Sequence, residues 1–300
     1  MMRLAGHTMG TPEYTLHGAM DLFAGMGLEG IEVIVQTDGY PCAIALDAGK
    51  RDVAAMRAAA ADRGLEIAAL TPYLNLFNAT DEAVRQRECD ALKRVTDMAA
   101  EAGAKNIRVY GGKFVDGEDD AQGLKLDALV RSMRECGDHA GACGVRLNME
   151  NHFGTMTTTA RATAAVAARI AHPAVGILYD QANIAFFPAE EYPEAIRLQK
   201  DWIHYVHCKD LVYRGGTPQK PRFSHVSHVD EDERTVHSRI PGEGILDWPG
   251  ILRALHAAGY GGWVSLEYER RWQKVDLPDA SVGMRRAAEH IRGILEEIYG

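Results

Sequence analysis

The sequence predicts an α/β fold in which one domain forms a single (β/α)8 barrel. Two observations carry this prediction: eight apolar, often β-branched segments alternate strictly with eight segments of helical spacing, and the 300 residues exceed the ~250 that such a barrel needs. At 46% hydrophobic, the chain can build a large core. An open doubly wound sheet of six or seven strands is the alternative. It is less favoured because eight units in a chain of this length suit a closed barrel better. No strand is followed by a GxGxxG or GxxxxGK[ST] loop, which weakens nucleotide-binding alternatives.

The first half of the chain supplies four strands and three helices. Gly27, Gly64 and Gly103 each follow a run of helical spacing, as glycine does at helix ends, and Asp81 is a typical N-cap. The segment Gly30–Val35 is rich in β-branched residues and predicts a buried strand. In chain order, we expect strand 2–9, helix 15–26, strand 30–35, helix 50–63, strand 65–70, helix 81–102 and strand 106–110.

The second half repeats the alternation. A helix ends at Gly144, and an Ala-rich helix begins at Thr159 and stops at His172-Pro173. In chain order, we expect helix 123–142, strand 145–150, the helix from Thr159, strand 175–180, helix 190–200, strand 203–207, helix 248–258, strand 263–267 and helix 281–299. A long polar segment at about 211–240 interrupts the pattern as an inserted loop within the single domain 1–300.

Charge and composition exclude several classes of protein. The 33 Lys and Arg against 42 Asp and Glu give a net charge of −9, which argues against a nucleic-acid partner. No apolar run approaches the ~18 residues of a membrane span, and the first residues lack the apolar core of a signal peptide. The cysteines are odd in number and scattered, which indicates reduced thiols and a cytoplasmic protein: Cys42, Cys89, Cys136, Cys143 and Cys208.

Four successive predicted strands end in a good metal ligand, namely Glu150, Asp180, His207 and Glu267. One such residue would be ordinary at a strand–loop junction, but the C-terminal strand ends of a barrel converge on its active site. Three neighbouring carboxylates would repel one another unless a cation lay between them. Oxygen-rich ligands with one imidazole favour a single divalent ion, with Mn²⁺ expected first and Mg²⁺ or Co²⁺ as alternatives.

These residues stand in motifs that resemble the xylose isomerase-like TIM-barrel superfamily, in its sugar phosphate isomerase/epimerase branch. The motifs are Met149-Glu150-Asn151-His152, Tyr179-Asp180, His207-Cys208-Lys209-Asp210, Pro241-Gly242-Glu243-Gly244 and Ser265-Leu266-Glu267, and the segments 71–76 and 81–103 also fit. The resemblance implies that Glu150, Asp180, His207 and Glu267 hold one divalent ion. In ketose 3-epimerases of this family, the glutamates matching Glu150 and Glu267 also exchange the substrate proton.

The expected function is a divalent-metal-dependent sugar isomerase or epimerase. Removing a proton beside the carbonyl of a ketose or keto-sugar gives a metal-stabilised enediolate. The same intermediate also permits loss of a β-hydroxyl, so the alternative is a lyase or dehydratase acting on a keto-sugar, an inosose or a 3-keto-glycoside, including carbon-linked glycosides. A hydrolase like endonuclease IV is a minor alternative that the acidic charge disfavours, and a non-catalytic sugar-binding barrel is another.

Further side chains are candidates for substrate contacts, each with a purely structural role as the competing interpretation. They are His7, Tyr73, Asn75, His152, Asn183, Lys209 and Arg239. Asn183 stands where many relatives have a histidine, and an amide cannot relay a proton near neutral pH.

The inserted segment has its own features. It contains His225, His228 and His237 among acidic residues, but a solvated loop, a lid or a subunit contact is favoured over a second metal site. An acid lies within Gly242-Glu243-Gly244, so we expect an unphosphorylated sugar substrate. A homo-oligomer or a partner subunit is a further expectation.

Overall fold

A computed structural model describes residues 1–37, 39–115, 117–187, 190–216 and 233–300. Within these ranges, eight parallel strands close into a barrel, because β1 pairs with both β11 and β2. In spatial order from β1 they are β1 (Arg3–His7), β11 (Trp263–Leu266), β8 (Ile203–Cys208), β7 (Val175–Tyr179), β6 (Arg146–Glu150), β5 (Asn106–Val109), β4 (Glu66–Pro72) and β2 (Gly30–Val35). The predicted single (β/α)8 barrel is confirmed.

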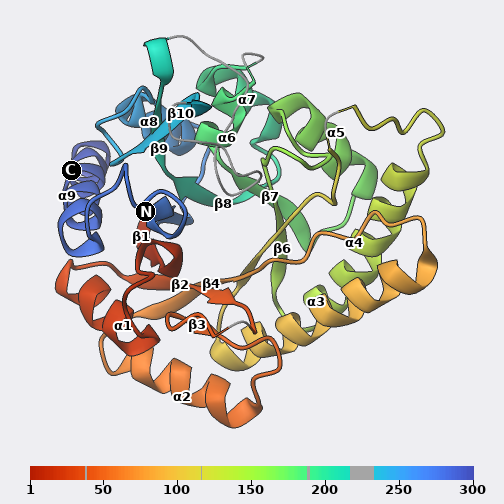
Figure 1. Ribbon diagram of the computed structural model, residues 1–300, viewed down its shortest axis with the longest axis horizontal. Coiled ribbons are helices and arrows are strands. Elements are labelled where there is room, and N and C mark those ends of the chain that lie inside the picture. The colour runs from red at the N-terminus through yellow and green to blue at the C-terminus, as the bar shows by residue number, and fades with distance from the viewer. Residues whose placement is uncertain (38, 116, 188–189, 217–232) are drawn as a thin grey trace.

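Helices form the outer ring around these strands (Figure 1). Side chains cap several of them: Thr15, Asp81 and Thr159 each accept a hydrogen bond from a backbone N–H in the first turn that follows. The ring consists of α1 (Leu16–Gly25), α2 (Lys50–Ala61), α3 (Glu82–Ala102), α4 (Leu124–Ala142), α5 (Ala160–Ile170), α7 (Tyr192–Gln199), α8 (Trp248–Ala257) and α9 (Ala280–Tyr299). None of the described helices is long and apolar enough to cross a membrane.

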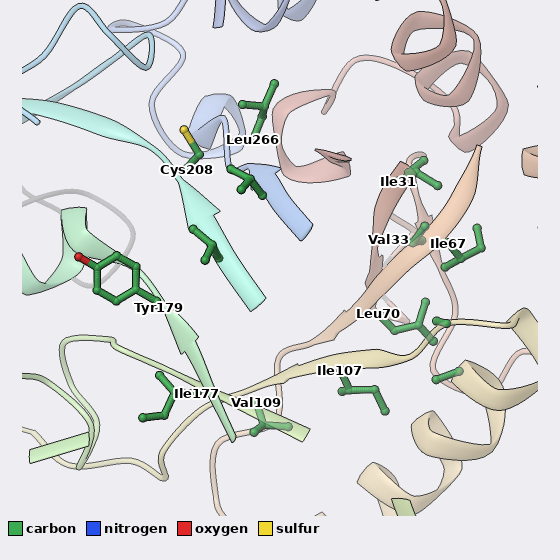
Figure 2. Packing of buried hydrophobic residues seen from close by; sticks show 14 of the residues in the cluster. Ile31, Val33, Ile67, Leu70, Ile107, Val109, Ile177, Tyr179, Cys208 and Leu266 are labelled. Carbon is green, nitrogen blue, oxygen red and sulfur yellow. The ribbon is translucent and has the colours of Figure 1, made fainter. Parts of the chain in front are cut away.

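The main hydrophobic core lies between the strands and this ring. Figure 2 shows β-branched and leucine side chains such as Ile31, Val33, Leu70 and Ile107 packed there, all fully buried. A second, smaller cluster joins Ala5, Ala68, Ala69, Leu178 and Tyr205. Because these residues come from β1, β4, β7 and β8, on different sides of the barrel, the second cluster fills part of the barrel interior.

The segment expected as one loop at about 211–240 contains regular structure at both ends. β9 (Asp210–Tyr213) and β10 (Val236–Arg239) form an antiparallel pair in which Tyr213 lies opposite Val236. Each strand has only four residues and lies within a polar segment. The alternation of apolar and polar residues was therefore too short to predict a strand. His225 and His228 lie outside the described residues. Two other short elements are β3 (Ala43–Ile44), beside β2, and α6 (Gln181–Ala185), directly after β7.

Candidate metal centre

Four predicted ligands lie at the C-terminal ends of four neighbouring strands. Glu150 is the last residue of β6, Asp180 follows β7, His207 lies near the end of β8, and Glu267 follows β11. One donor atom from each residue lies within 4.8 Å of the others, and all four side chains are buried. Since β11, β8, β7 and β6 are adjacent in the barrel, their parallel arrangement makes these side chains converge.

The chemistry of this cluster fits a divalent cation. Three carboxylates and one imidazole share a buried space. Burial, together with the negative charges of Glu267 and Glu150, outweighs the Lys209 charge and raises the pKa of Asp180 to about 7. His207 points Nδ1 at the cluster, 3.2 Å from Glu150 Oε1 and 3.4 Å from Glu267 Oε1. An ion bound between these donors would have three oxygen ligands and one nitrogen ligand, the preference of Mn²⁺ and related hard ions.

Glu32 in β2 contacts His207 Nε2, the ring nitrogen that faces away from the four-residue cluster. The sequence did not reveal this contact. The Glu32 carboxylate oxygens lie 3.1 and 3.2 Å from His207 Nε2, and the carboxylate also accepts hydrogen bonds from Tyr205 Oη and Thr71 Oγ1. A carboxylate on one imidazole nitrogen fixes the ring so that the other nitrogen faces a metal. The available signal was a charged residue inside the β-branched segment Gly30–Val35.

Arg108 in β5 is the second side chain that the sequence analysis missed. Its Nε and Nη2 lie 2.7 and 2.6 Å from Glu150 Oε2, and both residues are buried. Its guanidinium carbon lies 3.5 Å from the centre of the Tyr110 ring, which limits its movement. Burial would raise the pKa of Glu150, but the Arg108 charge lowers it, and the pKa falls to about 2. Glu150 is therefore held as a carboxylate.

Lys209 and Asn183 contact the four-residue cluster directly. Lys209 Nζ lies 2.9 Å from Glu267 Oε2 and 3.1 Å from Asp180 Oδ2, and these carboxylates outweigh burial and raise its pKa. Asn183 donates from Nδ2 to Asp180 Oδ2 at 3.0 Å and to Glu150 Oε1 at 3.5 Å. Its amide thus orients two of the carboxylates.

His7 and His152 lie at the edge of the cluster. His7 Nε2 is 3.4 Å from Glu32 Oε1, and its Nδ1 accepts a hydrogen bond from the backbone N–H of Met9. His152 Nδ1 lies 2.6 Å from the Phe153 carbonyl oxygen. Because a carbonyl oxygen can only accept a hydrogen bond, Nδ1 is the donor. In the neutral ring, Nε2 therefore carries the lone pair. Burial lowers the pKa of His152 to about 4, so the neutral form dominates.

The remaining predicted contacts lie farther from the four ligands. Tyr73 follows β4, with its ring 5.6 Å from the Arg108 guanidinium carbon. The backbone N–H of Asn75 donates to Glu88 of α3, and Arg239 donates from Nη1 to the Ser238 carbonyl. Among the described residues, neither Asn75 nor Arg239 hydrogen-bonds to the four ligands, so their substrate contacts stay predictions.

The side chain of Asp210 is held by the backbone of residues 242–246. Its carboxylate accepts hydrogen bonds from the backbone N–H groups of Gly242, Gly244 and Leu246 at 3.0 to 3.2 Å. A Cβ at Gly244 would lie 2.0 Å from Asp210 Oδ1, so glycine is needed for this close approach. The N–H groups that a substrate phosphate would need are therefore already bound to a carboxylate.

The chain resembles known proteins over most of its length. A family model described as xylose isomerase-like TIM barrel matches residues 20–294. An inosose dehydratase from Geobacillus thermodenitrificans is 26% identical over 230 residues, covering 73% of this chain and 74% of that protein. A 3-dehydroshikimate dehydratase from Pseudomonas putida is 26% identical over 256 residues, covering 84% of this chain but 36% of that longer protein.

Solved structures share the fold. A D-psicose 3-epimerase crystallised in the presence of D-fructose superposes with a TM-score of 0.71, covering 99% of this chain and 98% of the epimerase. The two sequences are 17% identical, so this likeness concerns the architecture. Dehydratases and epimerases therefore both occur among the proteins that resemble this chain.

Proposed function

Because this chain belongs to the xylose isomerase-like TIM barrel family, we propose that it is a divalent-metal-dependent lyase that removes water from a polyhydroxylated ketone. Glu150, Asp180, His207 and Glu267 hold the ion, with Mn²⁺ expected and Mg²⁺ or Co²⁺ as alternatives. When bound, such an ion polarises a carbonyl and stabilises the negative charge that proton removal leaves on the substrate. The dehydratases among the relatives support this choice over the isomerase or epimerase first expected.

The observation that carries the proposal is the contact between Glu267 and Lys209. Glu267 Oε2 and Lys209 Nζ lie 2.9 Å apart, which puts a base and an acid side by side on one side of the site. Elimination of water needs both groups, one to take a proton from carbon and one to give a proton to the departing hydroxyl. Proton exchange alone needs no acid at this position.

The reaction balances on these two side chains. Glu267 takes the proton from the carbon beside the carbonyl, and a carbon–carbon double bond forms as the β-carbon–oxygen bond breaks. Lys209 gives its proton to the departing hydroxyl, which leaves as water. The proton on Glu267 then passes to Lys209 across their contact, and both groups return to their starting charge.

Epimerisation is the second candidate because Glu150 and Glu267 both reach the same centre. A two-base epimerase needs proton carriers on both faces of the substrate. Glu150 suits that role poorly, since two nitrogens of Arg108 hold its Oε2 in place. We therefore propose Glu150 as a fixed ligand and Glu267 as the proton carrier.

The variant Lys209→Gln tests the lyase directly. With Mn²⁺-loaded protein and 2-keto-myo-inositol or 3-dehydroshikimate in D2O, dehydration should fall by about 10²-fold or more, the usual contribution of a general acid. Incorporation of deuterium beside the carbonyl should change by less than about tenfold, because Glu267 is still present. Proton NMR follows both processes in one sample.

Two results would contradict the lyase. One is a wild-type protein that exchanges and inverts the carbon without releasing water, which would favour the epimerase. The other is a Lys209→Gln variant that dehydrates substrate at the wild-type rate. A circular-dichroism spectrum identical to wild type checks that the variant is folded.

A further inference from the structure

Three segments at the barrel mouth bring together buried donors that have no hydrogen-bond partner among the described residues. Tyr40 lies in the segment after β2, Tyr73 follows β4, and Arg271 ends the short 3-10 helix Glu269–Arg271 after β11. The four ligands occupy β6, β7, β8 and β11, so Tyr40 and Tyr73 stand on the other half of the mouth. The guanidinium carbon of Arg271 lies 4.0 Å from the Tyr40 ring centre and 5.3 Å from that of Tyr73.

Each of these three side chains has a buried polar atom without a hydrogen-bond partner among the described residues. The atoms are Tyr40 Oη, Tyr73 Oη and Arg271 Nη1. Buried donors are almost always paired, so two unpaired phenols beside an unpaired nitrogen of one guanidinium point to a missing acceptor. Burial raises the pKa of both phenols, which keeps them protonated and able to donate.

Arg271 also lacks a carboxylate partner among the described residues, while the charged residues near it in the sequence are paired. The neighbouring Arg270 and Lys274 both pair with Glu13, at 3.1 and 3.0 Å, and Glu269 lies 3.4 Å from Lys209. Arg108 provides a contrast: its guanidinium carbon lies 5.6 Å from the Tyr73 ring centre, but its charge is neutralised by Glu150. Within the described residues, Arg271 has no such carboxylate partner.

We propose that Arg271, with the hydroxyls of Tyr40 and Tyr73, binds a carboxylate of the substrate. This inference rests on the proposed function and names its substrate class: a polyhydroxylated keto acid whose ketone lies at the metal ligands and whose carboxylate lies at Arg271. One guanidinium and two neutral phenols match the single charge and the lone pairs of a carboxylate. A phosphate dianion would leave a second charge unmatched here.

Binding of two inert ligands tests this subsite without any turnover. Shikimate is a carboxylated ring with hydroxyls, and myo-inositol is a neutral one; neither contains a ketone. Calorimetry on Mn²⁺-loaded protein should give shikimate at least about tenfold tighter binding than myo-inositol. Arg271→Met should weaken shikimate binding by roughly 10- to 100-fold, as expected for a charge-assisted hydrogen bond, and leave myo-inositol unchanged.

Two variants serve as controls. Arg270→Met removes the neighbouring arginine, which pairs with Glu13, and should leave shikimate binding within about twofold of wild type. Arg271→Lys keeps the charge and should retain part of the affinity, which separates loss of the site from misfolding. Equal shikimate affinity in wild type and Arg271→Met, or no shikimate binding at all, would overturn the proposal.

A third ligand separates the anion types. Tighter binding of myo-inositol 1-phosphate than of shikimate, lost in Arg271→Met, would assign the subsite to a phosphate and overturn the carboxylate assignment. Failure of the proposed lyase is a different outcome: shikimate would still bind through Arg271, but no candidate ketone would lose water.

Discussion

Replacing Glu267 with glutamine should lower both deuterium exchange and dehydration by about 10²- to 10⁴-fold, the range of a positioned general base. The amide keeps the shape and an oxygen for the ion, but it cannot take a proton from carbon. The carboxylate is buried between His207 and Lys209, which hold it in one orientation, so water is a poor substitute. Single-turnover NMR on Mn²⁺-loaded protein measures both rates.

The control for Glu267→Gln is the same change at Glu66. Glu66 begins β4, at the opposite end of the barrel, where it pairs with Arg3 on the surface. Its replacement should leave both rates within about twofold of wild type. If Glu267→Gln retained wild-type exchange with full metal occupancy, another base would have to act, and His152, whose neutral Nε2 is available, would be the next to replace.

Replacing Arg108 with methionine should lower the free energy of unfolding by about 3–5 kcal/mol at pH 7, as when one partner of a buried ion pair is removed. Glu150 would then be a buried carboxylate without its cation. Because Arg108 lowers the folded-state pKa of Glu150 to about 2, that stabilisation is present above the unfolded pKa of ~4.3 and is lost as pH falls towards 2. Urea unfolding of the metal-free protein at several pH values measures this.

The loss of stability in Arg108→Met should depend on pH. The difference between wild type and Arg108→Met should be largest near neutral pH. It should shrink as pH falls through the pKa of Glu150 in the variant, which burial without the Arg108 charge raises above the ordinary ~4.3, and should go on shrinking towards pH 2. Arg108→Lys keeps the charge without the two-nitrogen contact and should fall between the two. A difference that stayed constant from pH 7 to pH 3 would show that lost packing on Tyr110, and not the ion pair, is responsible.

The sequence was sufficient to predict the barrel and the convergence of the four candidate ligand side chains. Both follow from one rule: parallel strands of a barrel put their C-terminal ends at one mouth, so Glu150 and Asp180, each at a strand end, had to be neighbours. Glu32 and Arg108 reach the site indirectly, because Glu32 contacts His207 and Arg108 contacts Glu150. Their side chains face the site because of strand register, and a single strand segment does not reveal which alternate residues point inward.

Other features depended on contacts between distant segments. Arg271 follows a predicted ligand by only four residues, but its role depends on where the loops of Tyr40 and Tyr73 lie. Likewise, β9 and β10 pair with each other across a long connection, so neither four-residue strand had a local signal. The carboxylate of Asp210 illustrates the same limit, since its partners lie 32 to 36 residues away.

We propose that a divalent ion held by Glu150, Asp180, His207 and Glu267 would make a carbon beside a ketone acidic. The most direct measurement is deuterium incorporation from D2O into 2-keto-myo-inositol and 3-dehydroshikimate, using protein stripped with a chelator and then reloaded with Mn²⁺. We predict no incorporation by the stripped protein, and incorporation that returns in proportion to bound Mn²⁺ and saturates at one ion per chain. Exchange at the same rate in stripped and reloaded protein, or none in either, would contradict the account.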